Sequence, residues 1–271
     1  MTPWTFASTP FLIAGPCVIE ADPVMDRVAE RLVGLGTKHG ITVCFKASFD
    51  KANRARLSSP RGPGLDEGLR TLDRIRREFG IPILTDVHTT EQISAVAQVA
   101  DVIQVPAFLS RQTDLLVAAG ASGLPVNVKK GQWMAPEDLV GAVEKIRESS
   151  GRGGAGTEVA VTERGTMFGY GDLVVDFRNF GKLKAVTGAA VVFDVTHSVQ
   201  RPGQGPGGTS GGDRAHVPAL MAAAAAAGVD GFFVETHPDP DAATSDRETQ
   251  WPLGDLEMLL QRALAHWRIG T

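Results

Sequence analysis

The sequence lacks the features that mark secreted, membrane-spanning and nucleic-acid-binding proteins. Only two of its 271 residues are cysteines, which excludes a disulfide framework and makes the reducing cytoplasm the expected location. No apolar run approaches the roughly 20 residues that span a bilayer, and the first residues lack the basic and apolar regions of a signal peptide. The formal net charge of −4 gives no reason to expect binding to nucleic acid or a membrane surface.

What is present is an ordinary globular composition, with 43% hydrophobic and 21% charged residues, long enough for one large α/β barrel or two small domains. Segments typical of buried strands alternate with segments typical of helices along nearly the whole chain. The expected strands cover residues 11–16, 41–47, 81–87, 101–106, 125–130, 157–163, 190–196 and 231–236. The expected helices cover residues 22–39, 64–79, 90–99, 111–121, 136–149, 176–187, 215–228 and 253–267.

Strict alternation of this kind predicts parallel strands joined by right-handed crossovers. Asp22–Pro23 is a typical helix start and Gly40 a typical helix end, which supports the first helix. Eight such units favour a closed (β/α)8 TIM barrel over an open sheet. Because we find no linker, boundary or repeat, we predict a single catalytic domain over residues 1–271.

Three expected strands end in side chains that bind metal ions. Cys17 follows the first strand, His197 follows the seventh, and Glu235 lies at the end of the eighth. Barrel closure makes these three strands neighbours, and barrel active sites lie at their C-terminal ends. Thiolate, imidazole and carboxylate suit Zn²⁺, Fe²⁺, Mn²⁺ or Co²⁺. A fourth ligand could come from Asp246, in the last loop, or from His237.

Taken singly, none of these residues would indicate a metal. A lone cysteine is more often a small buried hydrophobe, and a histidine at a strand end often only makes hydrogen bonds. Their joint occurrence on neighbouring strands favours the metal site. Cys44 lies inside a strand between Val43 and Phe45, and we expect it in the core.

Basic side chains gather after three other strands. In the fifth strand Val126 and Val128 should face the helices, so that Asn127 and Lys129 point into the barrel. A lysine there with no acid beside it in sequence predicts an anionic ligand, either phosphate or carboxylate, which Arg164 could bind through two hydrogen bonds. The basic residues are Lys46, Lys51 and Arg54 after the second strand, Lys129 and Lys130 at the end of the fifth, and Arg164 at the end of the sixth.

Other polar groups end the third and fourth strands. Asp86, His88 and Gln104 could bind hydroxyl groups of a ligand, although Asp86 could equally brace the loop that follows it. The Gly-rich segment 201–212 is too long for an ordinary turn between strand and helix. We therefore predict that it is a mobile active-site loop.

Several motifs together carry a resemblance to a known family. They include Ala14–Gly15–Pro16–Cys17, Lys51–Ala52–Asn53–Arg54, Thr85–Asp86–Val87–His88, Asn127–Val128–Lys129–Lys130–Gly131–Gln132, Asp194–Val195–Thr196–His197 and Val234–Glu235–Thr236–His237. With them the chain closely resembles the 3-deoxy-D-manno-octulosonate 8-phosphate (KDO8P) synthases from about residue 10 to residue 255. The related DAHP synthases carry Lys-Pro-Arg-Thr/Ser where this chain has Lys51–Ala52–Asn53–Arg54, which favours arabinose 5-phosphate over erythrose 4-phosphate as the aldehyde.

The resemblance implies a transferase that condenses phosphoenolpyruvate with D-arabinose 5-phosphate and water. The products would be KDO8P and phosphate, in KDO and lipopolysaccharide biosynthesis. Because metal-independent members have Asn in place of Cys17, the resemblance also implies one divalent ion per subunit, either Zn²⁺, Fe²⁺, Mn²⁺ or Co²⁺. Its implied ligands are Cys17, His197, Glu235 and Asp246.

The same resemblance implies roles for the other candidates. Phosphoenolpyruvate would meet Lys46, Ser48, Lys51, Lys129, Arg164 and His197. The pentose phosphate would meet Asn53 and Arg54, with Asp86 and Gln104 near its hydroxyl or aldehyde end. The expected catalytic residues are Lys51, Asp86, His88, His197 and Asp246. A neighbouring subunit of a homotetramer would contribute Phe108 and Arg111.

Two departures from the family pattern stand out. Ala55 replaces the serine that usually follows the Asn-Arg pair, and Gly171–Asp172 replaces two amides or Asp-Asn. Three other functions stay open on sequence alone: a DAHP synthase, a sialic-acid-type synthase that would leave Arg54 idle, and a non-catalytic barrel that binds metal or sugar phosphate. The intact sets of cations and metal ligands argue against the last of these.

Overall fold

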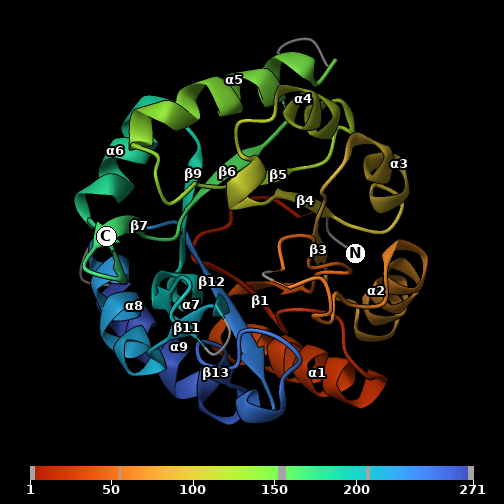
Figure 1. Cartoon of the computed structure of the whole chain (residues 1–271), viewed down its shortest axis with the longest axis vertical. Helices are drawn as coiled ribbons and strands as arrows, with labels where there is room; N and C mark the ends of the chain where they lie inside the picture. Colours follow the sequence, from red (N-terminus) through yellow and green to blue (C-terminus); the bar gives the residue numbers. More distant parts are fainter. Residues whose placement is uncertain (1–3, 55, 152–156, 206–207, 268–271) are drawn as a thin grey trace.

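The computed structural model describes residues 4–54, 56–151, 157–205 and 208–267. Within these residues, eight parallel strands close into a barrel because the last of them, β12, pairs with β1. Figure 1 shows the helices as a ring around these strands. The predicted (β/α)8 barrel is thus confirmed. The barrel strands are β1 (Phe11–Gly15), β2 (Thr42–Lys46), β3 (Ile83–Asp86), β4 (Val102–Val105), β5 (Val126–Lys129), β6 (Val159–Glu163), β9 (Ala190–Asp194) and β12 (Gly231–His237).

The outer helices follow their strands in the expected order. They are α1 (Asp22–His39), α2 (Leu65–Phe79), α3 (Ile93–Val96), α4 (Thr113–Ala121), α5 (Val140–Ser149), α6 (Arg178–Thr187), α8 (Val217–Ala226) and α9 (Leu256–Trp267). Short 3-10 turns precede several of them: η1 (Thr90–Gln92), η2 (Ala107–Leu109), η3 (Pro136–Leu139), η5 (Arg214–His216), η6 (Pro240–Ala242) and η7 (Leu253–Asp255). No helix among the described residues is long and apolar enough to cross a membrane.

The sequence signals for α1 are confirmed. The helix begins at Asp22 with proline in its first turn, and it ends at Gly40, whose φ of 64° is the left-handed conformation that glycine adopts at low cost. Most other elements agree with expectation to within a few residues. The helix expected over 90–99 is shorter, because a 3-10 turn occupies its start and α3 ends at Val96.

Apolar side chains form two cores, one on each side of the barrel wall. Alternate strand residues such as Val126 and Val128 face outward and pack under the helices, as the period of two predicts. Inside the barrel a smaller cluster holds Cys44, a confirmed core residue. That inner cluster comprises Trp4, Phe6, Phe11, Ile13, Cys44, Leu84, Val102, Ala160, Val192 and Phe233.

The predicted end of the seventh strand is wrong in a way that affects the site. The strand expected over 190–196 ends at Asp194, and Val195–Ser198 form the short helix α7. The Asp194 carboxylate explains the change, because it accepts a hydrogen bond from the backbone N–H of His197 at 2.9 Å and caps the turn. His197 therefore lies on a helical turn above the barrel and not on a strand.

Five short strands among the described residues were not predicted. The hairpin of β7 (Thr166–Gly169) and β8 (Asp172–Val174) follows β6, and β13 (Trp251–Pro252) pairs with the end of β12. In the Gly-rich segment, β10 (Gln200–Arg201) pairs with β11 (Gly211–Gly212). Its mobility stays a prediction, and both residues 206–207 and the departure at Ala55 lie outside the described residues.

Candidate active site

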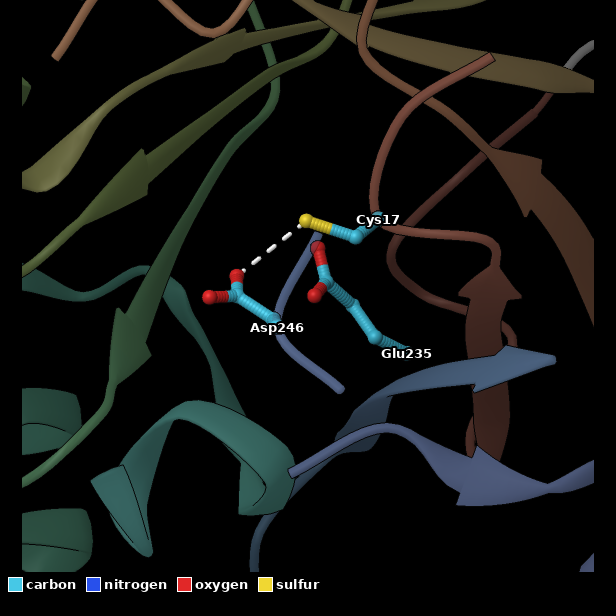
Figure 2. Close-up of side chains that lie close together, drawn as sticks. All are labelled: Cys17, Glu235 and Asp246. Atoms are coloured by element: carbon cyan, nitrogen blue, oxygen red, sulfur yellow. Dashed lines mark hydrogen bonds between the residues drawn. The ribbon is translucent and has the colours of Figure 1, made fainter. Parts of the chain in front are cut away.

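Three of the candidate metal ligands converge at the C-terminal end of the barrel. The Sγ atom of Cys17 lies 3.1 Å from Oδ2 of Asp246, and one ligand atom from each of Cys17, Glu235 and Asp246 lies within 4.8 Å of the others. Figure 2 shows the three side chains pointing toward one another from the loop after β1, from β12 and from the last loop. Cys17 and Glu235 are thus close together, as barrel closure predicted, and Asp246 joins them from the last loop.

His197 approaches the same cluster from α7. Its Nε2 atom lies 3.6 Å from Oε2 of Glu235 and 3.7 Å from Oδ2 of Asp246. The alternative fourth residue, His237, turns away: its Nδ1 accepts a hydrogen bond from the backbone of Asp239, and its Nε2 lies 3.5 Å from Glu20. Between the two residues that the sequence left open, only Asp246 joins the cluster.

Burial and neighbouring carboxylates control the charge of this cluster. Burial raises the pKa of the Cys17 thiol well above its ordinary value, and Asp246 and Glu235 raise it further. Burial lowers the pKa of His197, but the carboxylates of Asp194 and Glu235 outweigh this and raise it to about 9. In the metal-free protein the thiol is therefore neutral and donates a hydrogen bond to Asp246.

The donor set fits a divalent transition metal. Tetrahedral bonds of about 2.0–2.3 Å separate neighbouring ligand atoms by about 3.3–3.8 Å, which agrees with the two distances from His197. Glu235 Oε2 is buried and has no hydrogen-bond partner among the described residues. A buried carboxylate oxygen without a hydrogen bond is costly, and a cation bound by these four side chains would give it a partner.

The cationic candidates line the adjacent side of the barrel mouth. Lys129 is buried, with Nζ 2.6 Å from Oδ2 of Asp194 and 3.0 Å from the centroid of the Phe233 ring. Burial lowers the pKa of Lys129 to about 8 despite the attraction of Asp194. Arg164 is 5% exposed and donates from Nη2 to Gln200 at 2.6 Å. Its buried Nη1 has no partner among the described residues, which leaves a donor free for an anion.

A second polar chain runs from β2 to β3. Lys51 Nζ donates to Ser48 Oγ at 3.0 Å, and Ser48 Oγ donates to Asp86 at 2.5 Å. The other oxygen of Asp86 lies 3.0 Å from His88 Nε2. Asp86 is thus buried with both oxygens engaged. Burial raises its pKa, but the hydrogen bond with His88 and the charge of Lys51 outweigh burial and hold that pKa well below the usual range.

Lys46 joins this chain to the metal candidates. Its Nζ donates to Glu235 Oε1 at 2.7 Å and to the backbone oxygen of Cys17 at 3.0 Å. The Lys51 ammonium lies 3.9 Å from the same Glu235 oxygen. The cations, the acids and the thiol therefore form one continuous polar surface.

The remaining candidates lie farther out or have other partners. Gln104 Oε1 accepts from Asn127 at 3.0 Å inside the barrel, whereas Arg54 Nη1 donates to Ser245 at 2.7 Å above it. Asn53 and Arg111 are exposed. Phe108 is 55% exposed and stacks on Trp133 with ring centroids 5.9 Å apart. Within this chain, Asn53, Phe108 and Arg111 are not brought into the buried cluster.

The sequence reading assigned no role to two residues that the geometry makes central. Asp194 contacts Lys129 and also His197, whose Nδ1 lies 2.8 Å from Asp194 Oδ2. Gln200 holds Arg164. A sequence signal for Asp194 was present, because aspartate is a preferred capping residue and Asp194 ends an apolar strand. Its carboxylate can accept from the backbone N–H three residues on, which here belongs to His197. No sequence signal pairs Gln200 with Arg164.

Comparison with known proteins places these residues in context. The family model described as the DAHP synthetase I family matches residues 7–265. A 2-dehydro-3-deoxyphosphooctonate aldolase of Nitratidesulfovibrio vulgaris is 52% identical over 264 residues, which cover 97% of this chain and 94% of that protein. Proteins of the same name from Acidithiobacillus ferrooxidans (94% of this chain, 88% of the relative) and Methylobacillus flagellatus (93% and 88%) are each 51% identical.

Proposed function

This chain belongs to the DAHP synthetase I family, and from this premise we propose that it is a 3-deoxy-8-phosphooctulonate synthase. It is a transferase that forms a carbon–carbon bond, condensing phosphoenolpyruvate with D-arabinose 5-phosphate and water to give KDO8P and phosphate. Identity near 50% to relatives named 2-dehydro-3-deoxyphosphooctonate aldolase supports this substrate pair. The observation that carries the proposal is that two buried cations, Lys129 and Arg164, lie beside the Cys17–Glu235–Asp246 cluster. One nitrogen of Arg164 has no partner among the described residues.

Phosphoenolpyruvate occupies the cationic side of the mouth in this proposal. Arg164 presents its free Nη1 to the phosphate or carboxylate, and Lys129 exchanges part of its contact with Asp194 for the ligand. Lys46, Ser48, Lys51 and His197 complete the site. Cations fixed before binding need no reorganisation when charge moves in the transition state, which is a main source of catalytic power.

Arabinose 5-phosphate binds from the outer side. Arg54 binds its phosphate together with Asn53, and its aldehyde end lies toward Asp86 and Gln104. Holding the two substrates in this order puts C3 of the enol against the aldehyde carbon, which removes most of the entropic cost of bringing two reactants together. Phe108 and Arg111 serve a neighbouring subunit of a homotetramer, and their exposure in a single chain supports this part of the proposal.

One divalent ion, Zn²⁺, Fe²⁺, Mn²⁺ or Co²⁺, is held by Cys17, His197, Glu235 and Asp246. When bound, it supplies Lewis acidity toward an oxygen of the substrates. The proton that the reaction needs near the aldehyde is held between Asp86 and His88. Lys51 holds Ser48, and through it Asp86, in position. C3 bonds to the aldehyde carbon, whose oxygen takes up a proton. Water adds to C2 and gives up a proton, and phosphate leaves by cleavage of its C–O bond to C2.

The same proposal covers the setting of the enzyme. One barrel over residues 1–271 forms a single catalytic domain, which acts in the cytoplasm. Two free cysteines are consistent with that reducing compartment. The product then feeds lipopolysaccharide biosynthesis.

A phosphate-release assay tests the function. Phosphoenolpyruvate is offered with arabinose 5-phosphate, with erythrose 4-phosphate, or alone, each before and after treatment with a chelator. Release that requires arabinose 5-phosphate and stops on chelation supports the proposal. Faster release with erythrose 4-phosphate would instead identify a DAHP synthase, and no release with either aldehyde would point to a non-catalytic barrel.

A further inference from the structure

Gln250 links a segment near the start of the sequence, at Cys17, to the last loop of the barrel, at Ser245, beside the candidate metal site. It is a fully buried residue directly before β13. Its side-chain Oε1 accepts a hydrogen bond from the backbone N–H of Cys17 at 3.3 Å. Its Nε2 donates to the backbone oxygen of Ser245 at 2.8 Å. One side chain thus bridges the residue that carries the thiol and the residue next to Asp246.

The position of Gln250 is fixed by the strand that carries Glu235. Trp251 and Pro252 of β13 pair with Thr236 and His237 of β12, and the Thr236 hydroxyl donates to the Trp251 backbone oxygen at 2.8 Å. The backbone N–H of Gln250 also donates to the backbone oxygen of Asp246 at 3.0 Å. The bridging side chain therefore projects from a rigid point beside Glu235.

Both residues at the ends of the bridge need support. Asp246 has a φ of 49°, a left-handed conformation that costs energy for any residue but glycine and persists only where the surroundings hold it. The Cys17 peptide is held from both sides, because its oxygen accepts from Lys46 at 3.0 Å while its N–H donates to Gln250. Without Gln250 that buried N–H would lose its partner.

We propose that Gln250 is a positioning residue of the metal site, which fixes Cys17 and Asp246 so that both side chains reach one ion. The inference rests on the metal dependence of the proposed function. Groups that orient the ligands of a metal from behind commonly change metal affinity by about 10–100-fold when they are replaced. Gln250 does this by hydrogen bonds to the backbone N–H of Cys17 and the backbone oxygen of Ser245, and not by hydrogen bonds to the thiol or the carboxylate.

The test is Co²⁺ binding by the full-length Gln250→Met protein. Methionine fills a similar volume and makes neither hydrogen bond, so we expect Co²⁺ affinity, measured by competition with a coloured chelator, to fall by about 10–100-fold. The thiolate-to-cobalt charge-transfer absorption should weaken, because Cys17 is no longer held toward the ion. A Cys17→Asn protein gives the reference spectrum without thiolate.

Two controls separate positioning from general destabilisation. Ser245→Ala keeps the backbone oxygen that Gln250 binds, so Co²⁺ affinity should be unchanged. Leu260→Ala lowers stability from the buried face of α9, and Co²⁺ affinity should again be unchanged. Equal loss in Leu260→Ala and Gln250→Met would overturn the inference.

A third variant keeps the test sharp if Gln250→Met does not fold. Gln250→Glu retains an oxygen toward the Cys17 N–H, so the charge-transfer band should survive; Co²⁺ binding without that band would contradict the proposal. Unchanged affinity in Gln250→Met would refute the positioning role while leaving the proposed function intact. A wild-type protein that binds no Co²⁺ through a thiolate would instead refute the metal site itself.

Discussion

The two ends of the barrel interior are built from opposite kinds of side chain. At the N-terminal end, Trp4, Phe6 and Phe11 pack edge to face, with ring centroids 5.5 Å apart for Trp4 and Phe11. At the C-terminal end, the interior is filled by charges that are at most 5% exposed, among them Lys46, Lys129, Arg164, Asp194 and Glu235. We call these regions the floor and the mouth. Phe233 marks their boundary, since it belongs to the apolar cluster and yet carries Lys129 over its ring.

The difference teaches where stability and function reside in this chain. Apolar burial at the floor is favourable in proportion to the area removed from water. Buried charges at the mouth pay a desolvation cost that pairing repays only in part. In the proposed function, these fixed charges bind the anionic substrates and a cation, which gives a reason for an arrangement that is costly in stability. A substitution that lowers stability at the floor should therefore leave substrate binding at the mouth unchanged. A substitution that removes function at the mouth should leave the packing of the floor unchanged.

Phe11→Ala tests the floor and should have one of the two largest effects on stability. The ring is buried against Trp4, Phe6 and Gly231, and truncating a buried phenylalanine typically costs about 3–5 kcal/mol of unfolding free energy. Urea denaturation measures this, while KM for phosphoenolpyruvate should stay unchanged. Phe168→Ala is the matched control, because that ring is 79% exposed and its loss should cost less than about 0.5 kcal/mol. A shifted KM in Phe11→Ala would mean that the two ends are coupled.

Arg164→Ala tests the mouth. Loss of one preorganised donor commonly lowers turnover by about 10²–10³-fold, or about 2.7–4 kcal/mol, so kcat/KM for phosphoenolpyruvate should fall by that factor. Stability should not fall, because one nitrogen of Arg164 is already buried without a partner. Arg164→Lys should recover only part of the loss, since it keeps the charge and not the planar fork. Normal saturation by phosphoenolpyruvate in Arg164→Ala would exclude its role.

The mouth, and not the floor, should make stability depend on pH. The pKa of His197 is about 9 in the metal-free folded protein, against about 6.5 when unfolded. The folded state therefore keeps a proton that the unfolded state loses, and stability should fall from pH 6.5 to pH 8 by up to about 1.4 kcal/mol per pH unit. Above pH 8 Lys129 opposes the trend, because its lowered pKa makes the folded state release a proton first.

Urea titrations of the chelated protein at several pH values measure this slope. Phe11→Ala should keep the slope of the wild-type protein at a lower overall stability. His197→Gln should flatten it. A slope that survives in His197→Gln would assign the titration to another group.

The sequence predicted the barrel and the meeting of Cys17 with Glu235 for the same reason, whereas Asp246 was one of two alternatives that the strand order left open. Alternating strand and helix segments fix the order of the strands, and order fixes which strand ends become neighbours. The inward orientation of Lys129 likewise followed from the period of two along β5. Those predictions needed only topology.

The parts that escaped prediction depend on contacts between distant side chains. Asp194 ends β9 early by capping α7, and β13 pairs with β12 at the point where the Thr236 hydroxyl binds the Trp251 backbone. In the sequence Gln250 is an ordinary polar residue, and only the folded structure shows that it binds the backbone of Cys17. No local pattern encodes the Gln250 or the β12–β13 pairing, although the cap at Asp194 has a local signature. Sequence alone also could not show that Gln104 is already engaged by Asn127.

The smallest effect should come from the rim of the mouth. Arg201 in β10 donates to Asp172 in β8 at 2.5 Å, and Gln204 donates to the Gly171 oxygen. This contact joins the Gly-rich segment to the Gly171–Asp172 departure from the family pattern. Because both charged side chains are well exposed, water screens the pair and its loss should matter little.

Asp172→Asn should therefore leave the urea midpoint unchanged, at low and at high salt. Asp194→Asn is the matched contrast, because the same substitution in the mouth removes a charge that is 1% exposed and paired with both Lys129 and His197. Breaking a buried pair in this way typically costs about 3–5 kcal/mol. If the two variants behaved alike, burial would not be what separates the mouth from its rim, and the boundary of the mouth would have to be drawn to include β8 and β10.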